Sequence, residues 1–301
     1  MRALVITPDT PSGLALSETP EPDLTPDKVL VDVAEISLNY GEVSHARSGV
    51  AEAGEVHGWD AAGVVARTTE DGSGPAVGTR VVTFGFSGAW AQRRAVPVSE
   101  IAVVPDAVDL AVAATVPVAG VTALRALRRS GPLLGRRVVV TGASGGVGRM
   151  AVQLAARAGA HVIAQAKRGD GLAELGAHEV VANLDGLEPA SVDVVLDNVG
   201  GGQLVRAWDA LAPGGVIQSI GWTSGEPATF QPYATVGAAK SLTAFNMGPE
   251  LGPDMAYLLD LVAAGQLRVD IGWRGSWQRY DEAANALINR EVSGKAVLSV
   301  D

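Results

Sequence analysis

Apolar and polar residues follow their clearest pattern between residues 137 and 166. Residues 138–140 are all valine, and a continuous β-branched run of this kind is typical of a strand buried on both faces. From Arg149 the apolar residues recur with helical spacing, and Gly159 is a natural end for that helix. Residues 161–164 form a second apolar run. The pattern therefore predicts a strand, a helix and a second strand, which together make a βαβ unit.

The chain on either side of this unit has two different characters. The first ~110 residues contain short strand candidates between turn-forming residues and little helical periodicity, which indicates a β-rich, barrel-like module. In the centre, strands alternate with helices and amount to six, as in a doubly wound parallel sheet, and a closing strand returns to the first module. The predicted strands are 3–6, 28–33, 61–66, 80–84, 95–98, 138–140, 161–164, 179–181, 192–196, 216–220, 241–245 and 296–300, and the predicted helices are 111–117, 121–129, 149–159, 172–175, 203–211, 255–264 and 281–289.

A glycine-rich turn joins the first strand of the βαβ unit to its helix, with the spacing G-x-x-G-x-x-G. Gly142 allows the tight turn, Gly145 or Gly146 lets the backbone approach a pyrophosphate, and the last glycine lets the helix pack closely on the strand. Free amides at the helix N-terminus attract phosphates. An ordinary strand-to-helix turn is the alternative, but the flanking elements favour a dinucleotide site. Its predicted contacts are Gly142, Ser144, Gly145, Gly146, Val147 and Gly148.

The residues after the second strand indicate which dinucleotide binds. An NAD site usually has an acidic residue there, whereas this chain has Lys167 and Arg168. Charge-assisted hydrogen bonds from these cations to a 2′-phosphate are worth about 1.5–3 kcal/mol each. We therefore predict NADPH. The alternative is that both cations are solvated and that Asp170 binds the ribose of NADH.

Composition narrows the function classes. The net charge of −10 argues against nucleic acid or an anionic membrane as a partner. The absence of cysteine excludes disulfides, thiolate catalysis and cysteine-ligated zinc. The first residues do not form a signal peptide, and no apolar run approaches the ~18 residues of a membrane span. We therefore expect a soluble cytoplasmic protein.

Motifs along nearly the whole chain resemble those of the medium-chain dehydrogenase/reductase superfamily, in its zinc-independent quinone oxidoreductase and enoyl reductase branch. The resemblance implies an α/β protein with a GroES-like catalytic domain at 1–112 and 247–301 and a six-stranded Rossmann domain at 113–246. It also implies a homodimer, paired through the last Rossmann strand near residues 241–245. The matching motifs are 37–40, 58–65, 77–81, 117–124, 142–148, 175–177, 193–200, 211–215 and 294–298.

Departures from the zinc-dependent members identify the branch. Those members carry a Gly-His-Glu motif where this chain has Gly58-Trp59-Asp60, and a tryptophan cannot bind a metal. No cysteine stands near Asn39, and the cysteines of the structural zinc lobe are absent. His45 and His57 lack a third ligand at suitable spacing, which favours surface or hydrogen-bonded roles. We predict no metal.

The resemblance then implies transfer of a hydride from NADPH to a small electron-poor acceptor. We favour the C=C bond of an α,β-unsaturated carbonyl compound, an enone, over a quinone. Two further alternatives are a non-catalytic NADPH-binding regulatory protein and an NADH-linked alcohol dehydrogenase. The Gly-x-Tyr-Pro tyrosine of several enoyl reductases is replaced here by Gly49-Val50-Ala51-Glu52, so the proton must come from another group or from water.

The family also suggests roles for individual residues. Asn39 matches a polar residue near the nicotinamide and can donate to a carbonyl, and adjacent Tyr40 is either an acid or a packing residue. The implied substrate pocket lies between the domains and includes Trp59, Phe86 and Trp222, although Trp222 can also be a packing aromatic. The implied cofactor contacts beyond the glycine turn are Thr122, Asn198, Gly221, Phe245, Asn246 and Lys295.

Overall fold

The structure is a computed structural model that describes residues 1–301, and the chain divides into two compact units. Unit 1 contains Met1–Val121 and Gly248–Asp301, and unit 2 contains Thr122–Met247. The first division therefore follows residue 121 and not residue 112. The intervening segment stays with unit 1 because, among other contacts, the backbone N–H of Val118 donates to the Asp60 carboxylate at 3.1 Å.

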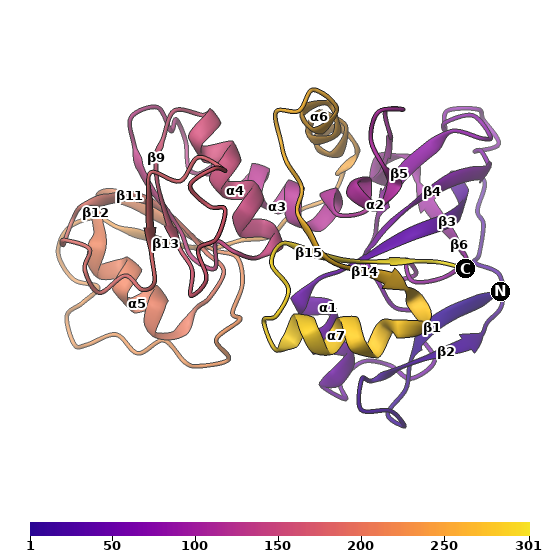
Figure 1. Cartoon of the computed structure of the whole chain (residues 1–301), viewed down its shortest axis with the longest axis horizontal. Coiled ribbons are helices and arrows are strands. Elements are labelled where there is room, and N and C mark those ends of the chain that lie inside the picture. The colour runs from indigo at the N-terminus through magenta and orange to yellow at the C-terminus, as the bar shows by residue number, and fades with distance from the viewer. The chain divides into compact units, whose positions relative to one another are not determined.

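Unit 2 is built on a parallel sheet with the order β10-β9-β8-β11-β12-β13. The helix α4 contacts β8 and β9, and α5 contacts β11 and β12 (Figure 1). The strands run outward in both directions from the β8–β11 pair, as in the predicted doubly wound sheet. The elements are β8 (Arg137–Val140), α4 (Gly146–Arg157), β9 (His161–Gln165), β10 (Glu179–Val181), β11 (Val192–Asp197), α5 (Gly201–Ala210), β12 (Leu211–Ser219) and β13 (Ser241–Ala244), preceded by α3 (Val121–Arg129).

The valine run at 138–140 forms a strand buried on both faces, as predicted. Val138, Val139 and Val140 are almost completely buried, because β8 lies in the middle of the sheet. In the register of the sheet, Val140 stands opposite Ala164 of β9 and Leu196 of β11. The carboxyl ends of β8, β9 and β11 therefore lie next to one another, and in a sheet of this topology that edge binds the ligand.

Unit 1 is largely β-structure. Its main sheet has the order β14-β15-β3-β4-β5-β7, with β6 also paired to β3, and β1 and β2 form a separate antiparallel pair. Its helices are few. The elements are β1 (Arg2–Ile6), β2 (Leu14–Glu18), β3 (Lys28–Leu38), α1 (Tyr40–Arg47), β4 (Asp60–Arg67), β5 (Arg80–Phe84), β6 (Arg93–Pro97), β7 (Ile101–Val103), α2 (Leu110–Ala113), a π-helical turn (Val116–Gly120), α6 (Gly252–Ala263), β14 (Ile271–Ser276) and β15 (Lys295–Ser299), with α7 (Tyr280–Ile288) between the last two.

The two ends of the chain build this unit together. β15 pairs antiparallel with β3, so that Leu298 stands opposite Ile36, and α7 packs beside α1 (Figure 1). The side chains of Trp90 and Trp277 are both completely buried in the shared core. The predicted return of the closing strand to the first module is confirmed.

Several elements differ from the sequence expectations. The segment 172–175 is a series of turns and not a helix, because Gly171 and Gly176, both with positive φ, bound too short a stretch. The predicted helix at 111–117 is the short α2 followed by the π-helical turn. The strands β2, β7 and β14 and the helix α1 were not predicted. No helix has both the length and the apolar composition needed to cross a membrane.

Candidate functional site

The glycine turn of unit 2 has the geometry of a dinucleotide-binding turn. Gly142 has φ +61°, which favours glycine, and a Cβ on Gly148 would lie 2.5 Å from the Cα of Ala143. Gly145 is the N-cap of α4, and no side chain caps this helix. Its first backbone amides are therefore open to an anion, which the positive end of the helix dipole also favours. These residues fit a bound pyrophosphate.

Hydrogen bonds fix the neighbouring ends of β8 and β11. The Thr141 hydroxyl donates to the Asp197 carboxylate at 2.7 Å, and the Asn198 amide donates to the Thr141 carbonyl at 2.8 Å. The backbone N–H of Gly200 also donates to Asp197, at 3.0 Å. Burial raises the pKa of Asp197. Asn198 therefore holds the ends of β8 and β11 together, and a Cβ on Gly221 would lie only 3.0 Å from the Asn198 carbonyl oxygen.

The end of β9 carries exposed positive charge. Lys167 and Arg168 follow the strand and are both exposed. Gln165, at the end of the strand, is buried and accepts a hydrogen bond from the Gly142 N–H at 3.2 Å, so the glycine turn and this end of β9 are connected. The Asp170 side chain is exposed, while its carbonyl accepts from Arg149 at 3.1 Å. The two cations therefore follow the strand whose end joins the turn expected to bind the pyrophosphate.

The segment 245–247 is bound to α3 within unit 2. The Arg129 guanidinium lies 4.9 Å from the centre of the Phe245 ring and donates to the Asn246 carbonyl. The Thr122 hydroxyl donates to the Met247 sulfur at 3.5 Å. The segment 245–247 therefore lies along α3.

Trp222 is 45% exposed, and its ring covers Gly200, where a Cβ would lie 2.5 Å from the indole. The indole N–H donates to the Glu226 carbonyl. The Trp222 ring therefore combines local packing with an exposed surface.

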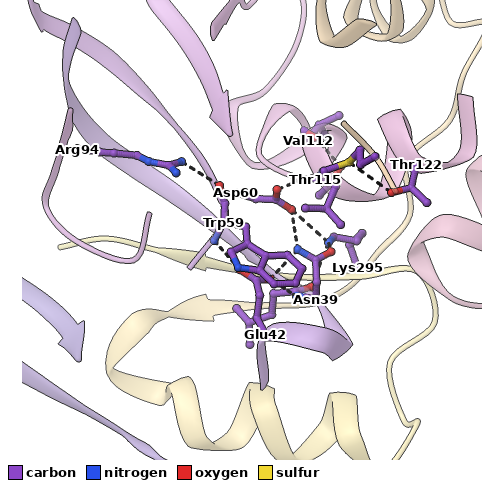
Figure 2. Close-up of polar contacts among 12 residues, drawn as sticks. Asn39, Glu42, Trp59, Asp60, Arg94, Val112, Thr115, Thr122 and Lys295 are labelled. Carbon is purple, nitrogen blue, oxygen red and sulfur yellow. Dashed lines mark hydrogen bonds and ion pairs between the residues drawn. The ribbon is translucent and has the colours of Figure 1, made fainter. Parts of the chain in front are cut away.

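Unit 1 contains a buried polar network around Asn39 (Figure 2). The Asn39 amide nitrogen donates to Glu42 at 2.6 Å and to Asp60 at 2.8 Å. The Lys295 ammonium donates to the Asn39 amide oxygen at 2.5 Å and to the Leu38 carbonyl at 3.0 Å, and it lies 3.7 Å from the Asp60 carboxylate. The network brings residues from the start, middle and end of unit 1 together.

The charges of this network are strongly perturbed by burial. Glu42 and Asp60 are completely buried, and Lys295 is only 3% exposed. Burial, and then the nearby charge of Asp60, raises the pKa of Glu42 to about 8. Burial also raises the pKa of Asp60 and lowers that of Lys295, whose charge is stabilised by both carboxylates. The Lys295 ammonium therefore lies close to the buried carboxyl groups of Asp60 and Glu42.

Asn39 and Tyr40 differ in whether they have a hydrogen-bond donor left for a substrate. Both amide hydrogens of Asn39 are bound by carboxylates, so donation to a substrate requires one of these bonds to be exchanged. Tyr40, the first residue of α1, is half-buried, and its hydroxyl makes no hydrogen bond within the chain. Of the two predicted catalytic residues, Tyr40 is the one with an uncommitted donor.

Two aromatic side chains lie next to the network. Trp59 precedes Asp60 and is half-buried, whereas Phe86 is 67% exposed. Their ring centres are 5.9 Å apart in an edge-to-face arrangement. The predicted pocket residues Trp59 and Phe86 are therefore brought together within unit 1.

No group of three or more histidine, aspartate or glutamate side chains is placed to hold a metal ion. His57 is buried, lies 3.0 Å from the Glu42 carbonyl through Nε2, and stacks on His45 with a ring separation of 6.0 Å. Burial lowers the pKa of His57. His57 is therefore held by a backbone carbonyl, and His45 packs against its ring.

Glu42, Arg94 and Asp197 were not predicted as site residues. The pattern Asn39-x-x-Glu42 is a capping-box signature, and the Asn39 N–H indeed donates to Glu42 at 2.8 Å. That pattern would have signalled the start of α1, a helix that was not predicted, but it carries no sign of burial. Arg94 and Asp197 have no comparable local signal, because their partners come from distant segments.

Comparison with known proteins agrees with this geometry. A model described as the alcohol dehydrogenase GroES-like domain matches residues 25–106, and one described as zinc-binding dehydrogenase matches residues 159–298. Prostaglandin reductase-3 from Bos taurus is 32% identical over 240 residues, which cover 67% of this chain and 64% of that protein. Several polyketide synthases also match, but the chain spans only 6–14% of their length.

Solved structures match over the whole chain. The quinone oxidoreductase from Coxiella burnetii has a TM-score of 0.87 and 25% identity, and the match covers 100% of this chain and 99% of that one. The yhdH oxidoreductase from Salmonella enterica in complex with NADP has a TM-score of 0.81 and 25% identity, with complete coverage of both chains. The chain therefore belongs to the medium-chain dehydrogenase/reductase superfamily, in the zinc-independent branch of quinone oxidoreductases and enoyl reductases.

Proposed function

We propose that the chain is an NADPH-dependent reductase that transfers a hydride to the C=C bond of a small α,β-unsaturated carbonyl compound. The observation that carries this proposal is the coexistence of two features. Unit 2 has an open helix N-terminus behind a glycine turn, next to a strand that ends in Lys167 and Arg168. Unit 1 has a lysine, an asparagine and two carboxylates beside Trp59, where zinc-dependent relatives carry a metal-binding histidine.

The residues of unit 2 would hold NADPH in a defined way. The amides at the start of α4 bind the pyrophosphate, and Lys167 and Arg168 bind the 2′-phosphate. Asn198 and Gly221 shape the edge of the sheet beside the turn. Thr122, Phe245 and Asn246 complete the contacts of this unit with the nicotinamide.

Reduction of an enone needs a hydride, a proton and a hydrogen-bond donor to the carbonyl oxygen. Bound NADPH would supply a hydride for the β-carbon of the enone, and a proton would complete the reduction at the α-carbon. Negative charge develops on the carbonyl oxygen, so a hydrogen-bond donor at that oxygen lowers the barrier. Tyr40 donates the hydrogen bond to the carbonyl oxygen, and Asn39, the N-cap of α1, orients the helix that begins at Tyr40. Water supplies the proton, and Trp59 and Phe86 line the acceptor.

Quinone reduction is the second candidate, and the likeness to the Coxiella burnetii quinone oxidoreductase favours it. A quinone also accepts a hydride and develops negative charge on an oxygen, so the same groups can serve both reactions. The two functions can therefore be distinguished only by which acceptor, an enone or a quinone, the protein reduces.

The test is anaerobic oxidation of NADPH and, separately, of NADH by the purified chain with a panel of enones and ortho- and para-quinones. Rapid use of NADPH with a saturated ketone as product supports the proposal. Turnover with quinones only makes the second candidate primary. Tight NADPH binding with no turnover of any acceptor would instead indicate a binding protein.

A further inference from the structure

Arg94 lies in β6 and is only 3% exposed, yet its guanidinium makes no direct hydrogen bond to a carboxylate. It donates to the Trp59 carbonyl at 2.9 Å, and to the carbonyls of Gly85 and Ser87 at 3.1 Å each. It also donates to the Thr83 hydroxyl at 3.1 Å. A guanidinium has five N–H donors in a rigid planar fork, so one side chain can hold several acceptors at once. Arg94 therefore fixes two separate stretches of backbone.

These backbone groups belong to Trp59 and to the two residues that flank Phe86, the second aromatic residue beside the network. Gly85 and Ser87 are the residues on either side of Phe86, so Arg94 holds the loop that carries this exposed ring. The Trp59 residue is held from both ends. Its carbonyl accepts from Arg94, and its N–H donates to the Glu42 carboxylate at 2.5 Å (Figure 2).

The space around the two rings is equally constrained. A Cβ on Gly41 would lie 3.3 Å from the edge of the Trp59 indole, so α1 packs closely against that ring. A Cβ on Gly85 would lie 2.5 Å from the Arg94 guanidinium. Phe86 also contacts Phe84 edge to face, with ring centres 5.1 Å apart. We call Trp59 and Phe86 the aromatic wall.

We propose that Glu42 and Arg94 are positioning residues that hold the aromatic wall rigid, and that the wall makes the enzyme select flat, aryl-conjugated acceptors over open-chain ones. This inference rests on the proposed function. Aromatic rings prefer offset or edge-to-face contacts with other π-systems, and such contacts require defined ring positions. A wall held in advance keeps more of the binding free energy than one that must be ordered by the substrate.

The experiment compares two acceptors that differ only in the group proposed to contact the aromatic wall. These are trans-4-phenylbut-3-en-2-one and trans-pent-3-en-2-one, which share the enone but carry a phenyl or a methyl group. The wild-type chain should prefer the phenyl compound by at least tenfold in kcat/KM. Arg94→Lys, which keeps the charge but loses the fork, should reduce this preference about tenfold, mainly through KM of the phenyl compound. Glu42→Gln should act in the same direction.

Arg93 provides a matched control, because it is the neighbouring residue of β6 but is exposed and paired with Asp32 at 3.0 Å. Arg93→Lys should leave the preference within twofold of wild type. Phe86→Leu alters an exposed side chain and should fold normally, so it tests the wall even if a variant of the buried network does not fold. An unchanged preference in Phe86→Leu and in a folded Arg94→Lys would overturn the inference.

A binding measurement separates this inference from the proposed function. The saturated ketone 4-phenylbutan-2-one can be titrated by tryptophan fluorescence, with Trp59→Phe identifying the signal of Trp59. We expect about tenfold weaker binding to Arg94→Lys than to wild type, with NADPH affinity unchanged. If the wild type reduces neither enone but binds 4-phenylbutan-2-one about tenfold more tightly than Arg94→Lys does, the proposed function is wrong. The inference about the aromatic wall is then still supported. Equal affinity of both proteins would refute the wall.

Discussion

At the scale of single residues, the catalytic proposal depends on Tyr40. Its hydroxyl has no partner within the chain, whereas both amide hydrogens of Asn39 are bound to carboxylates. Tyr40→Phe should lower kcat with an enone at least tenfold, because the ring stays and only the donor to the carbonyl oxygen is lost. NADPH affinity should not change. Steady-state kinetics with wild-type rates in Tyr40→Phe would return the role to Asn39 or to water.

The choice of cofactor depends on the two cations after β9. Removing both in Lys167→Ala/Arg168→Ala should raise KM for NADPH tenfold or more and leave KM for NADH within about twofold. Each lost charge-assisted bond is worth about 1.5–3 kcal/mol when buried, and less at these exposed positions. Arg67→Ala, an exposed arginine at the end of β4, is the control. A parallel loss for both cofactors would show that the pair does not read the 2′-phosphate.

The raised pKa of Glu42 predicts a pH dependence of stability. Because its pKa of about 8 in the folded chain lies above its ordinary value of 4.5, the folded state binds more protons between these values. This residue therefore makes the free energy of unfolding decrease as pH rises from about 4.5 to 8. Glu42→Gln should flatten that slope in denaturant titrations at several pH values. A slope as steep as that of wild type would contradict the assignment.

At the scale of elements, the fit between β8 and α4 requires Gly148. A Cβ there would lie 2.5 Å from both the Ala143 Cα and the Gly142 carbonyl oxygen, which are backbone atoms that cannot move independently. Gly148→Ala should therefore displace the turn and weaken NADPH binding more than tenfold. Gly202→Ala, at the start of α5, meets no atom within 4 Å and should bind NADPH normally. Calorimetric titration of both variants tests this difference.

The central elements were predictable because their signals are local. The valine run of β8, the spacing of α4 and the positive φ of Gly159 follow from neighbouring residues in the sequence. β14 was not predicted because none of its residues is buried and it pairs only with the distant β15. The helix predicted at 111–117 overlaps the short α2 and only the first two residues of the π-helical turn at 116–120. Tertiary pairing decided these cases.

The site was predictable to a different degree in the two units. The turn from Gly142 to Gly148 carries its function in its spacing, so the sequence was sufficient. The network of unit 1 joins Glu42, Asp60 and Lys295 across 253 positions of the chain, and nothing in the local pattern shows that they meet around Asn39. The burial that changes their pKa values is a property of the folded sheet.

At the scale of the whole molecule, we expect a homodimer. β13 is an edge strand of the sheet, all four of its residues are exposed, and they include Leu242. Pairing of two such edges across a two-fold axis would cover them. Sedimentation equilibrium should give twice the chain mass for wild type and the mass of one chain for Leu242→Lys. A monomeric wild type would rule out the dimer.

The central claim is that the chain itself reduces a conjugated C=C bond with a hydride from NADPH. The most direct measurement is anaerobic reduction of trans-4-phenylbut-3-en-2-one with NADPH that carries two deuterium atoms at C4 of the nicotinamide, followed by mass spectrometry and NMR of the product. The account predicts 4-phenylbutan-2-one with one deuterium on the carbon β to the carbonyl and a solvent hydrogen on the α-carbon. An allylic alcohol, or no product from an enzyme saturated with NADPH, would contradict it.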